Sequence, residues 1–162
     1  MTEAKADGYA VWSRVLSEGS KPPRLIVCER SGRWAVRLRR ARGVGLPVEE
    51  TRSFSDAWQA LVAAPASFLV FELTAAGVGN LLQRLPTLER EFPLARVAVV
   101  AGRRLAAYEL AVREAGAVHF TCSGRGLRPL VDIVGRHLAA VPQSPSSLAE
   151  QVWASLPWTT AG

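Results

Sequence analysis

The chain has 162 residues, of which 49% are hydrophobic, and its 20 basic against 14 acidic side chains give a formal net charge of +6. That length is typical of one domain and is sufficient to bury a stabilising hydrophobic core. No apolar run approaches the roughly 20 residues that a membrane span needs, and two cysteines are too few for a disulfide framework. The first seven residues are polar, unlike a secretory signal, so we expect a cytoplasmic protein with no membrane partner.

Short apolar runs alternate with helical patterns from residue 24 onward. Residues 24–30 are apolar in the middle and lie between a Pro-Pro and a Ser-Gly pair, which predicts a strand buried on both faces. Apolar residues then recur at helical spacing from Trp34 to Ala41. Ser31 is the predicted N-cap of this helix, and Gly43 and Gly45 are its predicted end.

The same alternation continues to residue 140 and predicts an α/β fold. Helices must return the chain between parallel strands, so we expect a three-layer sandwich, with a five-stranded parallel sheet covered by helices on both faces. Right-handed crossovers leave few strand orders, of which the flavodoxin-like order 2-1-3-4-5 is common. The remaining predicted strands are 48–54, 67–73, 96–101 and 118–122, and the remaining predicted helices are 55–62, 105–115 and 127–140.

The pattern divides the chain into three segments: an N-terminal extension (1–22), the α/β domain (23–140), and a linker with a short helical tail (141–162). Apolar residues at helical spacing from Leu148 to Leu156 predict the helix of the tail. A helix this short is marginal in water, so it docks on its own domain or on a partner. In the second case Trp153 is the anchor, since tryptophan is prominent at interfaces.

Two stretches resemble the receiver domain of two-component response regulators, the CheY-like domain. Residues 67–73 (SFLVFEL) look like the third strand of that family. Residues 111–120 (AVREAGAVHF) are similar to the helix, glycine turn and aromatic strand that precede the family's lysine, with Gly116 at the point where the helix must stop. In order and spacing the resemblance covers residues 24–140.

The resemblance implies a set of phosphorylation residues that this sequence lacks. A working receiver has an acidic pair after strand 1 for magnesium, an aspartate after strand 3, a hydroxyl after strand 4 and a lysine after strand 5. Magnesium favours oxygen ligands, so a thiol in the acidic pair argues against a metal site. We therefore expect a degenerate receiver with no metal, no cofactor and no catalytic residue. The corresponding positions are Cys28 and Glu29, Glu72, Ala101, and Ser123.

Two interpretations of Glu72 stay open. Glutamate is one methylene longer than aspartate, so its carboxylate would project to where a phosphoryl oxygen would lie and act as a permanent partial mimic. A mimic also needs a two-state element that reads its charge, and the hydroxyl and lysine of that element are missing. Alternatively, Glu72 is an ordinary half-exposed acid paired with Arg30 or Arg103.

By the resemblance, the expected function is phosphorylation-independent signalling through a protein partner, with self-association as a homodimer included. The family's helix 4, strand 5 and helix 5 face is the expected interaction surface. The residues of this surface are Tyr108, Arg113, Phe120 and Arg128.

Arginines concentrate in the first helix and suggest a different function. Arg33, Arg37 and Arg40 share one face, and guanidinium groups suit phosphate contacts, so the alternative is a nucleic-acid-associated protein. The other interpretation is a solvated face in an arginine-rich protein. No helix-turn-helix, zinc finger or RNA-binding aromatic pair accompanies these arginines, so nucleic acid binding remains the second hypothesis.

Overall fold

The computed structural model describes residues 20–42 and 46–141, which form one five-stranded parallel sheet. The strand order β2-β1-β3-β4-β5 and the parallel pairing confirm the predicted flavodoxin-like topology. The strands are β1 (Leu25–Cys28), β2 (Val48–Thr51), β3 (Phe68–Leu73), β4 (Arg96–Ala101) and β5 (His119–Thr121).

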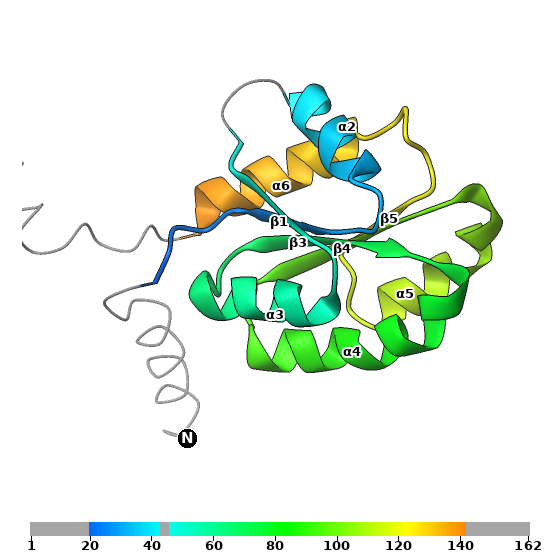
Figure 1. The fold of residues 1–162 in the computed structure, drawn as a ribbon, viewed down its shortest axis with the longest axis horizontal. Helices are drawn as coiled ribbons and strands as arrows, with labels where there is room; N and C mark the ends of the chain where they lie inside the picture. Colours follow the sequence, from blue (N-terminus) through cyan, green and yellow to red (C-terminus); the bar gives the residue numbers. More distant parts are fainter. Residues whose placement is uncertain (1–19, 43–45, 142–162) are drawn as a thin grey trace, which may run out of the picture.

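Helices cover both faces of the sheet and complete a three-layer sandwich (Figure 1). Helices α2 and α6 lie on one face, and α3, α4 and α5 lie on the other. Each follows a strand, and all but α6 return the chain for the next parallel strand. Their bounds are α2 (Arg33–Arg42), α3 (Phe54–Ala63), α4 (Val78–Glu91), α5 (Glu109–Glu114) and α6 (Arg128–Ala140), with the 3-10 helices η1 (Ala75–Gly77) and η2 (Arg103–Tyr108).

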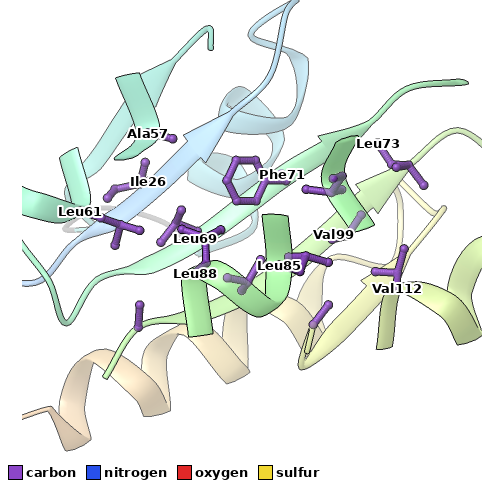
Figure 2. Close-up of a cluster of buried hydrophobic side chains, with 14 of the residues drawn as sticks. Ile26, Ala57, Leu61, Leu69, Phe71, Leu73, Leu85, Leu88, Val99 and Val112 are labelled. Atoms are coloured by element: carbon purple, nitrogen blue, oxygen red, sulfur yellow. The ribbon is translucent and has the colours of Figure 1, made fainter. Parts of the chain in front are cut away.

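The central strand β3 contributes to two separate cores. Phe68 and Val70 point to the α2 and α6 layer, whereas Leu69 and Phe71 point to the α3, α4 and α5 layer, and all four are almost fully buried. Figure 2 shows the second core, in which β1, β3 and β4 meet leucines of α3 and α4. Burial on both sides explains why this strand is a continuous apolar run in the sequence.

The first and last strands are shorter than the predicted 24–30 and 118–122, and two other differences from the predicted elements have local reasons. The second strand ends at Thr51 rather than 54, because Ser53 caps α3: its hydroxyl accepts a hydrogen bond from the Asp56 N–H at 3.1 Å. The predicted helix 105–115 is divided into η2 and α5, which meet at Tyr108. The predicted end at Gly116 is confirmed, since this glycine has a positive φ of 115°.

Helix α4 was the element without predicted bounds. Pro86 lies inside it and has no N–H to donate to the preceding turn, which normally interrupts a helix. Leu81, Leu85 and Leu88 are buried against the sheet at helical spacing and offset that loss. Tertiary packing therefore overrides the local signal here.

Several predictions concern residues outside the described ranges. They are the helical tail with Trp153, most of the N-terminal extension, and the glycines predicted to end the first helix. Within the part that is described, no helix is both long and apolar enough to cross a bilayer.

Candidate functional site

A hollow of about 370 Å³ lies beyond the carboxyl ends of β1 and β3, at the point of the sheet where the strand order reverses. Chain segments after β1, β2 and β3 form its walls, so residues far apart in the sequence meet there. Its polar lining residues are Cys28, Glu29, Arg30, Arg52, Ser53, Glu72, Thr74 and Asn80, and Phe54, Phe71 and Leu81 contribute apolar surface.

The carboxylate of Glu72 is already held by the chain itself. Its Oε2 accepts a hydrogen bond from the backbone N–H of Arg30 at 3.1 Å, and its Oε1 lies 3.4 Å from a guanidinium nitrogen of Arg33. The Glu72 side chain is only 12% exposed. The expected partner Arg30 therefore contributes its backbone, and Arg33 takes the place expected for Arg103. Glu72 joins the end of β3 to the start of α2.

Glu29 is turned into the first helix and caps it. Its carboxylate accepts hydrogen bonds from the N–H groups of Trp34 at 2.8 Å and Ala35 at 2.6 Å, and the residue is 2% exposed. A carboxylate at this end also complements the helix dipole. The predicted Ser31 cap is therefore replaced by Glu29, whose longer side chain reaches forward across a turn that Gly32 allows with its φ of 74°.

The thiol of Cys28 is a poor ligand and a poor nucleophile. Burial raises its pKa above the ordinary value, and the carboxylates of Asp56 and Glu72 raise this pKa further. Thiolate, rather than thiol, binds metals and attacks electrophiles. Cys28 is therefore protonated at neutral pH.

The two positions that would read a phosphoryl group carry small side chains. Ala101 ends β4 with a buried methyl group and has no hydroxyl. Ser123 follows β5, and its hydroxyl accepts a hydrogen bond from the Gly126 N–H at 3.2 Å, which shapes the turn before α6. Neither residue offers a positive charge to the hollow.

These side chains do not fit a magnesium ion. Magnesium requires several oxygen ligands in octahedral geometry. The Cys28 thiol is soft, the Glu29 carboxylate accepts two helix N–H groups, and the Glu72 carboxylate faces a guanidinium. Across residues 20–42 and 46–141, no three His, Cys, Asp or Glu side chains gather as a metal-binding group.

The predicted basic stripe on α2 is only partly free. Arg33 pairs with Glu72, and the guanidinium of Arg37 lies 5.5 Å from the ring centre of Trp34. Arg37 also fills the space beside Gly124, where a Cβ atom would collide with it. Arg40 is exposed and makes no ion pair with the described residues.

The elements of the predicted interaction face carry two exposed apolar side chains that the sequence did not predict. Leu110, two residues after Tyr108, is 68% exposed, and Val118, directly before β5, is 39% exposed. The available signal was that Leu110 lies off the helical face that carries the buried Val112. Arg113, which pairs with Glu109 at 2.9 Å, and Arg128 are exposed as expected.

Phe120 does not belong to this surface. It is only 5% exposed and packs in the core between the sheet and α5, so its assignment to the interaction face was wrong. The side chains of a strand alternate between the two faces of a sheet, and Phe120 takes the inward position in β5.

Comparisons with known proteins place the fold among receiver domains. No family model matches the sequence, and no curated protein matches it. A CheY-like protein (tadZ) from Pseudomonas aeruginosa PAO1 is 17% identical with a TM-score of 0.59, over 75% of this chain and 100% of that one. A response regulator from Thermotoga maritima is 18% identical with a TM-score of 0.62, over 74% and 100%.

A third solved structure is described as an atypical orphan response regulator with a phosphorylation-independent regulatory mechanism. It is 16% identical with a TM-score of 0.59, over 74% of this chain and 98% of that one. At such identities the likeness concerns the fold alone. The chain therefore has the receiver fold.

Proposed function

We propose that the chain is a receiver-like signalling module that acts through a protein partner and does not use phosphorylation. The main support for this proposal is that the Glu72 carboxylate is bound by other residues of the chain. This carboxylate occupies the acceptor position and is held by the Arg30 N–H and the Arg33 guanidinium. The phosphorylation-independent mechanism described for one protein of the same fold supports the proposal.

The chemistry of the hollow explains why a phosphoryl group is not needed. Phosphoryl transfer depends on positioning and on cations that neutralise developing charge. Here Arg33 already faces a permanent carboxylate, and Ala101 and Ser123 give no group that would follow a change in charge. The site is built for one constant state, so the output is independent of phosphodonors.

The edge of the domain formed by η2, α5, β5 and the start of α6 is the surface that we assign to the partner, which includes a second copy of the chain. Tyr108, Leu110 and Val118 expose apolar area, and the side chains of Arg113 and Arg128 are also exposed. Aromatic and apolar anchors with arginines nearby are typical of the side chains that dominate interface energies.

The first test combines mass and capture. After incubation with acetyl phosphate and magnesium, we expect the intact mass of the full chain to show no phosphoryl adduct. The tagged chain should capture the same partner from lysate with or without this treatment, and after nuclease. An adduct mapped to Glu72 or Glu29 would overturn the proposal. Nucleic acid that disappears with nuclease would instead support the alternative function.

A matched pair of variants tests the surface. We expect Leu110→Asp to abolish capture, because it places a charge among the exposed apolar side chains of the proposed face. The control is Val62→Asp, since Val62 is 57% exposed on α3, which packs on β1 and β2 toward the other edge of the sheet from β5. Equal loss in both variants would contradict the assignment of the face.

A further inference from the structure

Five exposed arginines follow the carboxyl ends of four strands, and we call them the arginine rim. Arg52 follows β2, Arg30 follows β1, Arg103 and Arg104 follow β4, and Arg125 follows β5. Strands in a sheet lie about 4.8 Å apart, so the rim extends over roughly 20 Å, from one edge strand to the other. The hollow with Glu72 lies within this span, and Arg30 and Arg52 line it.

The carboxylates near the arginine rim have partners within the chain. Glu72 faces Arg33, Glu29 is buried in the cap of α2, and Asp56 accepts a hydrogen bond from the Ser53 hydroxyl at 2.7 Å. Arg52 pairs with Glu50 and is still about half exposed. The other four rim arginines form no ion pair with the described residues. This edge of the sheet therefore attracts anions.

We propose that the arginine rim binds an acidic segment of a partner protein. The planar guanidinium group pairs with a carboxylate through two parallel hydrogen bonds, so a row of arginines suits a run of Asp and Glu side chains. The inference rests on the proposed function and deepens it, because it names the chemical class of the partner.

The surroundings of the rim favour an acidic protein over nucleic acid. Arg103, Arg104 and Tyr108 belong to the same 3-10 helix η2, and the exposed Leu110 lies two residues beyond its end, in the first turn of α5. The rim thus continues into large apolar side chains, which a protein segment with acidic and apolar residues complements. A phosphate backbone has no apolar group that would pack on Leu110. In the basic stripe of α2, Arg33 already pairs with Glu72 and Arg37 already stacks on Trp34.

The test measures fluorescence anisotropy of two labelled probes with the full chain. One is a peptide of alternating glutamate and leucine, and the other is an oligodeoxythymidylate of equal charge. We expect tighter binding of the peptide and weaker binding as salt is raised from about 50 to about 200 mM. Arg103→Gln, Arg104→Gln and Arg125→Gln together should weaken peptide binding by about tenfold or more.

The matched control removes the same charge elsewhere. Arg40, Arg90 and Arg136 are exposed in the second halves of α2, α4 and α6, which lead away from the carboxyl edge, and their combined change to Gln should alter peptide affinity by less than about twofold. Thermal unfolding verifies that both triple variants are folded. Equal losses in the two variants, or preference for the oligonucleotide, would overturn the inference.

Three further outcomes separate the inference from the proposed function. If the chain alone forms a dimer in light scattering that the rim variant disperses, the rim binds a second copy and the inference fails. If the rim variant still captures the lysate partner that Leu110→Asp loses, the rim is not the partner site, while the interaction module stands. Absence of any captured partner with the unaltered chain defeats the proposed function itself.

Discussion

The body of the sheet and its carboxyl edge follow different rules. In the body, side chains such as Leu69, Val70 and Val99 are fully buried and depend only on being apolar and of the right size. At the edge, Glu29, Glu72 and Arg33 are held by individual hydrogen bonds and ion pairs. The body therefore determines the fold, and the edge determines which chemistry the fold supports.

The residues that the resemblance assigns to phosphorylation belong to one of these two regions. The positions that the resemblance marks for phosphorylation lie at the carboxyl edge. There Glu29 and Glu72 have partners within the chain, and Ala101 has no hydroxyl. The sheet beneath keeps the parallel order of the receiver fold. Substitutions in the two regions should consequently differ in size and in kind.

The largest effect belongs to the body. Leu69→Ala removes a fully buried side chain between β3 and the α3 and α4 layer and leaves a cavity, so we expect the free energy of unfolding to fall by about 3 kcal/mol. Urea unfolding measures it. Val62→Ala, at a position 57% exposed, should change stability by less than about 0.5 kcal/mol. A small effect at Leu69 would mean that the core is loosely packed.

Glu29 should behave like a core residue although it lies at the edge. Glu29→Ala leaves the N–H groups of Trp34 and Ala35 without their acceptor at a buried helix end, and we expect a loss of about 2 kcal/mol in unfolding free energy. Glu29→Gln should lose less, because the amide oxygen still accepts. The exposed Glu91→Ala serves as a control. If Glu29→Ala lowers the unfolding free energy by less than about 0.5 kcal/mol, Glu29 does not stabilise the helix as a cap.

His137 makes the stability of the folded chain depend on pH. Its Nε2 lies 2.9 Å from the Ala66 carbonyl oxygen and its ring packs on Phe68, and burial lowers its pKa below the usual 6.5. The unfolded chain therefore binds a proton more readily than the folded one, so stability is complete above about pH 6.5 and falls as the pH drops below it.

We expect His137→Phe to reduce this acid sensitivity while keeping an aromatic ring against Phe68. Melting temperatures from about pH 7.5 to about pH 5.5 measure the effect, which should be smaller than that of Glu29→Ala. His119, whose pKa burial also lowers, remains in the variant and retains part of the sensitivity. An unchanged slope in His137→Phe would show that His137 does not contribute.

The smallest effect is expected at Glu72. Its partner Arg33 has a side chain that is 58% exposed, so the ion pair contributes less than about 1 kcal/mol to stability. We expect Glu72→Gln and Arg33→Gln each to lower the free energy of unfolding by less than about 1 kcal/mol. A double-mutant cycle in urea isolates the pair. Partner capture by Glu72→Gln decides the open question of mimicry: unchanged capture indicates an ordinary acid, and lost capture with intact stability indicates a mimic.

The fold was predictable because its signals lie in short apolar runs. Strand β4 was predicted with its observed bounds, and the alternation of strands and helices led directly to the observed strand order. Helix α4 was not delimited, because Pro86 masks a pattern that only packing of Leu81, Leu85 and Leu88 on the sheet reveals. Phe120 was misplaced, because the resemblance identifies its position without saying which way a side chain of an edge strand points.

The site was predictable only as a location. The sequence placed Cys28, Glu29 and Glu72 at one edge of the sheet, and the structure brings them together around the hollow. The sequence did not predict that Glu29 caps α2 or that Arg33 pairs with Glu72. Both contacts depend on the direction of side chains after the turn at Gly32. Contacts of this kind are decided by geometry that spacing along the chain does not encode.

The cap at Glu29 bears on any attempt to engineer a phosphorylatable version of this protein. A designer would begin with Glu72→Asp and an aspartate at Cys28, and would want the second acid of the pair to bind a cation. That acid is Glu29, whose two oxygens already accept the N–H groups that begin α2. If Glu29 turned toward a metal ion, the N-terminus of α2 would lose its cap. A substitution that supplies a new cap for α2 is therefore needed before phosphorylation residues are introduced.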